Sequence, residues 1–202
     1  MPATAPYHHG DLRAACLRAA LELLEEGGSG ALSLRAVARR AGVAPSAPYR
    51  HYADRDALVS AVAAIGYRQL AEHLAAASPV PQTPEDLAAV AVAYVQFALQ
   101  RPALFRVMFS EPCDRDSSER VAATTAISAY VAALVSKSFP DADPPALSTA
   151  VWALVHGLAF LHLDAKLSPS DPASVAQRVR GAVRALLTAS AATSTSTSRR
   201  QC

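Results

Sequence analysis

The stretch LSLRAVARRAGVAPSAPYRHYADRDAL, Leu32 to Leu58, decides how this chain is interpreted. Two prolines, Pro45 and Pro48, stand directly before a cluster of aromatic and basic side chains, Tyr49 to Tyr52. A proline costs about 3 kcal/mol in the interior of a helix but little in its first turn. The prolines therefore mark either a loop or the start of a short helix.

The neighbouring residues favour two short helices joined by a sharp turn. Ser33 can cap a first helix, and Gly42 can adopt the positive φ that a sharp turn requires. Pro45 then fits the first position of a second helix, with Pro48 at the edge of its first turn. The segment of about 31–52 therefore predicts a helix-turn-helix, whose second helix reads the major groove with its N-terminal part.

The composition favours an all-α fold. The chain has 202 residues, of which 51% are apolar, but only 8 are glycine and 6% aromatic. The net charge of +2 indicates little about binding partners, whereas the distribution of the charged residues is more informative. No acidic residue lies between Gly27 and Ala53, while Arg35, Arg39, Arg40 and Arg50 do. This pattern fits a nucleic-acid footprint and equally a solvated arginine face.

Apolar periodicity and proline-rich breaks organise the whole chain. A DNA-binding domain is expected over 7–57, a larger helical ligand-binding and dimerisation domain over 58–188, and a disordered tail over 189–202. We find no repeat and no convincing strand. Besides the short helix after Ser33 and the one that should follow Pro45, helices are predicted at about 10–26, 54–77, 85–100, 103–109, 117–139, 146–167 and 172–188.

Cysteines and histidines do not predict a metal site. Cys16, Cys113 and Cys202 lack the spacing of metal ligands, and unpaired thiols fit a reducing cytosol. The pair His8-His9 has no third ligand nearby, so a flexible polar arm is the preferred interpretation. No cofactor is expected.

The N-terminus lacks the apolar run of a signal peptide, so we expect a cytoplasmic protein. The most apolar stretch, Ala150 to Leu163, is too short to span a bilayer, and a buried core helix without a membrane partner is expected. With a second apolar stripe, Val175 to Leu187, it could form a four-helix interface between two subunits, which predicts a homodimer.

The quoted stretch resembles the DNA-binding signature of the TetR family of bacterial transcriptional regulators. That signature has a Gly-Val turn, then Tyr-x-His-Phe, then a lysine and an acidic residue before a leucine. Two departures matter. Ala44 stands where the family often has a capping Ser or Thr, and Arg55 replaces the usual lysine. The matching residues here are Gly42-Val43, Tyr49-Arg50-His51-Tyr52 and Arg55-Asp56 with Leu58.

The C-terminal part carries a second resemblance. The segment VWALVHGLAFL contains Trp152, His156 and Gly157, similar to the Trp-His-Gly motif of one C-terminal domain type in the family. The segment YHHGDLR, Tyr7 to Arg13, also resembles that subgroup. Together the resemblances imply an all-helical, two-domain homodimer that represses transcription until a small ligand binds the larger domain.

The resemblance also implies contacts with double-stranded operator DNA. Tyr49, His51 and Arg55 would bind phosphates, and positions near Ser46, Ala47 and Arg50 would face bases. Tyr49 could instead be a core aromatic, but the motif favours a DNA contact. Independently of the family, Ser33 and Arg35 could reach phosphate from the first helix of the motif.

The effector is expected to be a small apolar molecule of unknown identity. Trp152 and His156 lie one helical turn apart, so they form either a buried packing pair or a pocket wall with one polar handle. The remaining large side chains that could line the cavity with them could equally be core. These are Tyr94, Phe97, Phe105, Met108, Phe109 and Tyr130.

An enzyme is the least supported class, since no nucleophile elbow, phosphate loop or paired catalytic carboxylates occur. One rival is a helical ligand-binding or dimerisation module whose helix-turn-helix no longer binds DNA. This rival predicts no salt-dependent DNA affinity. The other is a constitutive DNA-binding protein, which predicts that no metabolite releases the DNA.

Overall fold

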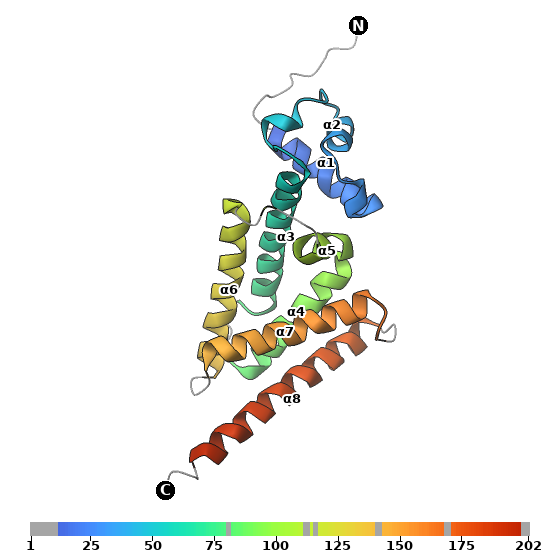
Figure 1. Ribbon diagram of the computed structural model, residues 1–202. Coiled ribbons are helices and arrows are strands. Elements are labelled where there is room, and N and C mark those ends of the chain that lie inside the picture. The colour runs from blue at the N-terminus through green and yellow to red at the C-terminus, as the bar shows by residue number, and fades with distance from the viewer. Residues whose placement is uncertain are drawn as a thin grey trace. The chain divides into compact units, whose positions relative to one another are not determined.

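The computed structural model describes residues 12–79, 82–110, 114, 117–139, 143–167 and 171–198 (Figure 1). All regular elements within these ranges are helices, as the predicted all-α fold requires. Tyr7 to Asp11, with His8 and His9, lie outside the described residues, as do Cys113 and Cys202.

Contacts within the chain divide it into two compact units. The first contains the chain up to Tyr67 together with Ala103–Ala123, and the second contains Arg68–Pro102 and the chain from Thr124 onward. The sequence predicted one boundary after residue 57, so the structure differs in giving the first unit a second, later segment. Helix α3, Arg55–Ala77, contributes to both units.

In the first unit, α1 (Leu12–Gly27) buries one apolar face. It contacts the 3-10 turn η1 (Ser29–Ala31), helix α2 (Leu34–Arg40) and the 3-10 turn η2 (Pro48–Arg50). Leu24 and Val37 are fully buried in this core, and each such side chain stabilises the fold by roughly 1.5–3 kcal/mol. The predicted apolar periodicity of α1 is confirmed by its buried residues Cys16, Ala19, Leu23 and Leu24.

Helix α2 begins and ends as its sequence predicts. The side chain of Ser33 accepts a hydrogen bond from the N–H of Ala36 at 3.1 Å. At the other end Gly42 has φ 68°, and the N–H of Val43 donates to the carbonyl of Ala38 at 3.0 Å. This is the Schellman closure, in which a left-handed residue satisfies the last carbonyls of the helix.

Helix α5 (Pro102–Ser110) approaches α3 closely within the first unit. A Cβ atom at Gly66 would lie 2.6 Å from the Sδ atom of Met108, so only glycine fits there without a shift. One residue on, the hydroxyl of Tyr67 donates to the carbonyl of Met108 at 2.7 Å. The two contacts fix α5 against the middle of α3.

The second unit is built around α4 (Pro84–Gln100), which packs against both α7 (Pro144–Leu163) and α8 (Pro172–Ser198) (Figure 1). Helix α6 is Ser118–Ser138. A helix that is apolar on all sides belongs in the interior, and α4 is buried from Leu87 to Val95 except at Ala89. Thr83 and Asp86 form a capping box at its start.

Two predicted helix ends are wrong. Helix α7 ends at Leu163, not Leu167, because Ala165 adopts φ 52° and Lys166 closes the turn onto the carbonyl of Leu161 at 2.9 Å. Without a glycine, the sequence carries no signal for this turn. Helix α8 continues to Ser198, past the predicted end at residue 188, since the alanine-, serine- and threonine-rich segment contains no proline or glycine. Residues 199–202 of the expected disordered tail lie outside the described part.

Helices α6 and α7 are both long and apolar enough to cross a membrane by length and composition, with mean hydropathies of 1.3 and 1.6. The expectation that the apolar run around residue 150 is too short to span a bilayer is therefore wrong. The run extends N-terminally into a helix of 20 residues. The expectation of a fully buried helix is also wrong, since Trp152 and Leu161 are exposed.

Candidate functional site

The segment Ala44 to Tyr52 does not form the predicted second α-helix. It consists of a turn, in which the N–H of Ala47 donates to the carbonyl of Ala44 at 2.9 Å, followed by η2. Pro48 is the cause, because it lacks the N–H that would continue the turn and its ring displaces the carbonyl four residues earlier. The helical start therefore lies at Pro48, and the prediction that it lies at Pro45 is wrong.

Two buried residues anchor this segment, and three exposed ones lie between them. Pro48 and Tyr52 are buried, and the N–H of Tyr52 donates to the carbonyl of Pro48 at 3.0 Å. Tyr49, Arg50 and His51 are exposed, Tyr49 to 53%. A large aromatic side chain that the fold leaves half in water, next to two basic ones, fits a surface that contacts a polyanion.

The other predicted DNA-binding residues lie in the same unit. Arg35 and Ser46 are exposed, Ala47 is half-buried, and the exposed Ser33 uses its oxygen to cap α2. Among the four arginines between Gly27 and Ala53, Arg40 differs from Arg35, Arg39 and Arg50 in that acidic residues neutralise it. Its guanidinium forms ion pairs with Glu22 (3.3 Å) and Glu26, and the hydrogen bonds that it donates to the Glu26 carboxylate raise the pKa of Arg40.

Arg55 was expected to bind a DNA phosphate, but in the structure its guanidinium donates to backbone carbonyls. Its Nε atom donates to the carbonyl of Leu32 at 3.2 Å, and an Nη atom donates to the carbonyl of Ser29 at 3.0 Å. These carbonyls belong to the turn that leads into α2. Arg55 therefore holds α3 to the helix-turn-helix, an arrangement that the planar fork of arginine suits better than the single ammonium of lysine.

Tyr52 carries a buried hydroxyl that has no hydrogen-bond partner among the described residues. Burial raises the pKa of this phenol to about 12. The family signature described above has phenylalanine at this position, so the hydroxyl is an addition to an otherwise apolar anchor. An unpaired buried hydroxyl costs on the order of 1–3 kcal/mol.

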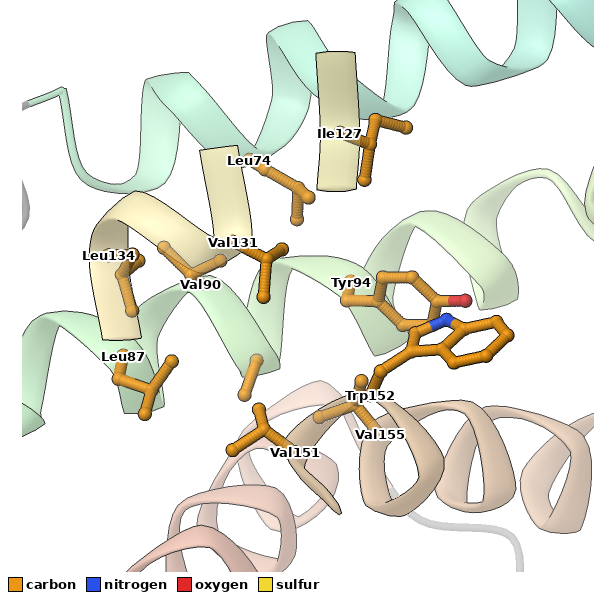
Figure 2. A pocket seen from close by; sticks show the side chains of 11 residues that line it. Leu74, Leu87, Val90, Tyr94, Ile127, Val131, Leu134, Val151, Trp152 and Val155 are labelled. Atoms are coloured by element: carbon orange, nitrogen blue, oxygen red, sulfur yellow. The ribbon is translucent and has the colours of Figure 1, made fainter. Parts of the chain in front are cut away.

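The second unit contains an apolar cavity, here called the Trp152 cavity (Figure 2). The space between its lining side chains, including the open solvent at its mouth, is about 440 Å³. No charged side chain lines it. Helices α3, α4, α6 and α7 supply its walls: Leu74, Leu87, Val90, Ala91, Tyr94, Ile127, Val131, Leu134, Val151, Trp152 and Val155.

The structure distributes the predicted ligand-pocket residues between the two units. Tyr94 and Trp152 line the Trp152 cavity. The hydroxyl of Tyr130 points instead toward the carbonyls of Ser78 (3.1 Å) and Leu74 (3.4 Å). Phe97 is buried in the second unit, whereas the three predicted residues of α5 lie in the first unit. These three are Phe105, Met108 and Phe109.

His156 does not line the cavity but contacts two residues that do, Tyr94 and Trp152. Its Nδ1 atom lies 2.9 Å from the hydroxyl of Tyr94, and its ring packs between those of Trp152 and Phe160, at centroid distances of 5.5 and 4.9 Å. Burial lowers the pKa of His156, so the imidazole is neutral at pH 7. Figure 2 shows the Tyr94 oxygen and the indole nitrogen of Trp152 at the same end of the cavity.

The aliphatic walls of the cavity were missed by the sequence analysis. Ile127 and Val131 of α6 recur at helical spacing, as residues that pack into a core also do. No sequence signal distinguishes the two roles. Within the described ranges, no three His, Cys, Asp or Glu side chains gather where they could hold a metal ion.

Family models match both parts of the chain. Residues 17–62 match the model described as bacterial regulatory proteins, tetR family, and residues 87–186 match the model of the tetracyclin repressor-like C-terminal domain. The chain is 33% identical over 94 residues to the HTH-type transcriptional regulator Rv1816 of Mycobacterium tuberculosis. That alignment covers 45% of this chain but only 40% of the relative.

Solved structures resemble the chain over most of its length. A protein of unknown function from Rhodococcus sp. RHA1 has a TM-score of 0.76 at 31% identity, covering 89% of this chain and 97% of the other. A bacterial regulatory protein in the tetR family from Rhodococcus RHA1 has a TM-score of 0.65 at 22% identity, covering 87% and 96%. At that identity the second likeness concerns the fold.

Proposed function

The chain belongs to the TetR family of DNA-binding transcriptional regulators, and from this we propose that it is a homodimeric repressor that a small apolar ligand releases from operator DNA. Members of the family are regulators, so the chain is not an enzyme. We expect it to be located in the bacterial cytoplasm, where operator DNA lies. We also propose the Trp-His-Gly subgroup, on the spacing of Trp152, His156 and Gly157.

The observation that carries the DNA-binding role is the exposed triplet Tyr49, Arg50 and His51, held between two buried anchors. Arg35 and Arg39 of α2 are also exposed and form no ion pair with another described residue. Tyr49 and His51 would bind phosphates, with Ser33 and Arg35, while Ser46, Ala47 and Arg50 would face bases. Two copies of this surface would bind two half-sites about 34–36 Å apart, or a multiple of that distance.

The homodimer is supported by the apolar surface of α7. This helix has no Asp, Glu, Lys or Arg from Pro144 to Leu163, yet Trp152 and Leu161 are 51% and 42% exposed. Because a DNA-binding regulator works on DNA and not in a membrane, we expect a second copy of the chain, and not a lipid bilayer, to bury this apolar face. Leu161→Arg should shift the molar mass measured by light scattering from dimer to monomer, whereas Val121→Arg, an exposed position of the first unit, should not.

A footprint on the region upstream of the chain's own gene tests the function. The expected result is protection of two half-sites, with an affinity whose logarithm falls linearly with the logarithm of salt concentration. The absence of any salt-dependent affinity would favour a module that has lost DNA binding. If the protein protects a site and no small-molecule extract of the source bacterium releases the protein from it, a constitutive DNA-binding protein is favoured.

A further inference from the structure

We propose that Glu119, at the start of α6, is a positioning residue for DNA reading: it holds Arg13 of α1 near the buried hydroxyl of Tyr52 and so fixes the segment that carries the exposed triplet 49–51. All of these residues belong to the first unit. Neither Arg13 nor Glu119 lies within residues 17–62, which match the tetR family model. This role rests on the DNA binding described above and not on release by a ligand.

An ion pair between Arg13 and Glu119 joins two helices that are distant in the sequence. The Nη2 atom of Arg13 donates to both carboxylate oxygens of Glu119, at 2.6 and 2.7 Å. Arg13 lies in the first turn of α1, and Glu119 lies in the first turn of α6. Both side chains are 44% exposed, so the pair contributes little to the stability of the fold. Its short charge-assisted hydrogen bonds nevertheless fix the direction of the arginine side chain.

The same face of α1 meets the buried anchor of the reading segment. Helix α1 contacts η2, and Tyr52, which follows η2, is buried. Burial raises the pKa of the Tyr52 phenol to about 12, and the charges of Arg13, Cys16 and Glu119 also act on it. Arg13 and Cys16 lie one helical turn apart on one face of α1, so this face is turned toward the hydroxyl. The arginine that Glu119 holds therefore lies near the anchor of the triplet.

The start of α6 is itself attached to α3. The hydroxyl of Ser60, a residue that is 1% exposed, donates to the carbonyl of Asp114 at 3.0 Å. The guanidinium of Arg120 lies 5.9 Å from the centroid of the Tyr67 ring, which is within cation–π range. Glu119 stands between these two attachments in the sequence. Its carboxylate therefore projects from a fixed base, which a residue needs if it is to hold another side chain in place.

Electrostatic attraction and positioning predict opposite effects of Glu119→Gln on DNA affinity. The variant removes one negative charge per chain, which on its own strengthens the attraction to phosphates. It also releases Arg13, whose side chain is then free to turn into solvent. If Glu119 positions the reading segment, DNA affinity should fall at least about threefold, because a dimer loses the ion pair twice. A smaller loss, or tighter binding, in fluorescence anisotropy at one salt concentration would overturn the proposal.

Two further variants separate positioning from a general effect of charge. Glu85→Gln makes the same change in the second unit, where Glu85 forms an exposed ion pair with Arg184, and it should not weaken DNA binding. The charge exchange Arg13→Glu with Glu119→Arg restores an ion pair in the opposite sense and should recover the parental affinity to within about twofold. If the exchange binds no better than Glu119→Gln, Arg13 acts on DNA directly and the proposal fails.

Hydrogen exchange measures the order of the segment without DNA. The N–H groups of His51 and Tyr52 both donate to the carbonyl of Pro48 at 3.0 Å. In Glu119→Gln these two should exchange at least about threefold faster than in the parent, while the N–H of Val43, which closes α2, should not change. No acceleration, or an equal acceleration at all three, would overturn the proposal. If the exchange responds as expected and the parent protects no DNA, the proposed function fails while the positioning by Glu119 stands.

Discussion

Tyr49 and Trp152 are large aromatic side chains with nearly the same exposure, 53% and 51%, and their surroundings differ in every other respect. Tyr49 stands beside Arg50 and His51, on a segment that supplies no wall of the Trp152 cavity. Trp152 lines that cavity, and its ring lies tilted against the ring of His156 at a centroid distance of 5.5 Å. The comparison teaches that exposure alone does not indicate a role. We therefore base the two proposed roles, phosphate contact for Tyr49 and an apolar contact for Trp152, on the charged or apolar residues that surround each ring.

The largest expected effect compares these two residues directly. Tyr49→Ala should weaken operator binding by about 30- to 150-fold, since a dimer loses two hydrogen bonds to phosphate at roughly 1–1.5 kcal/mol each. The loss should be similar on any sequence, because phosphate contacts carry no sequence information. Fluorescence anisotropy with labelled duplexes measures both.

Trp152→Phe is the matched variant in the other unit, and in the absence of a ligand it should change DNA affinity by less than twofold. A variant of Tyr49 that binds operator as tightly as the parent would contradict the assigned phosphate contact. A large loss of DNA affinity in Trp152→Phe would contradict the proposal that only Tyr49 of these two residues contacts DNA.

The second prediction compares two arginines. Arg55 is half-buried and donates to two carbonyls, whereas Arg184 forms an ion pair with Glu85 in which both side chains are mostly exposed. Arg55→Gln should lower the free energy of unfolding by about 1.5–3 kcal/mol, because it leaves part-buried carbonyls unpaired. Arg184→Gln should change it by less than about 1 kcal/mol, since exposed ion pairs contribute little. Urea unfolding of both variants gives these values.

Salt dependence then separates two roles of Arg55. If it only positions the helix-turn-helix, Arg55→Gln should lower DNA affinity without changing the slope of log affinity against log salt. If it also binds phosphate, the slope should decrease by about 0.9 for each phosphate that the variant no longer neutralises.

The third prediction compares two tyrosine hydroxyls. That of Tyr52 is buried without a partner among the described residues, and that of Tyr94 is paired with His156. Tyr52→Phe should raise the free energy of unfolding by about 1 kcal/mol, since it removes an unsatisfied polar group, and Tyr94→Phe should lower it by a similar amount. Thermal unfolding monitored by circular dichroism measures both. A destabilised Tyr52→Phe would mean that the hydroxyl forms a hydrogen bond in solution.

The smallest effects concern two residues with positive φ that follow helices, Gly42 in the first unit and Ala165 in the second. An alanine in this conformation costs roughly 1 kcal/mol relative to glycine. Gly42→Ala should therefore destabilise the protein by about that amount, and Ala165→Gly should stabilise it by about 0.5 kcal/mol, the gain being reduced by the greater freedom of glycine in the unfolded chain. Opposite signs in urea unfolding support the pair of assignments. The same sign in both would contradict them.

These pairs also explain which features the sequence could predict. The cap at Ser33 and the turn at Gly42 were predictable, because each depends on one residue type and its immediate neighbours. The turn at Ala165 was not, since alanine does not mark a left-handed position. Within the helix-turn-helix, the order of elements was predictable but the effect of Pro48 on the second helix was underestimated.

The cavity was predicted least well, for a different reason. Its recognition depends on which helices meet, and apolar periodicity describes the face of one helix at a time. Tyr94 and Trp152 were identified because they are large aromatic side chains, a residue type that commonly lines ligand cavities. The aliphatic wall of α6 was not, because Ile127 and Val131 have the pattern of ordinary core residues.

The discontinuity of the first unit has a consequence for synthesis on the ribosome. Tyr67 leaves the ribosome before Met108, whose carbonyl it will bind, and the 35 residues 68–102 must be made between the two segments of that unit. At roughly 5–20 residues per second, this takes about 2–7 s. During that interval α3 lacks its α5 partner, so a nascent chain released at Tyr67 would carry an incomplete DNA-reading unit. The first unit begins the sequence, yet all of its residues are present only once Ala123 has been made.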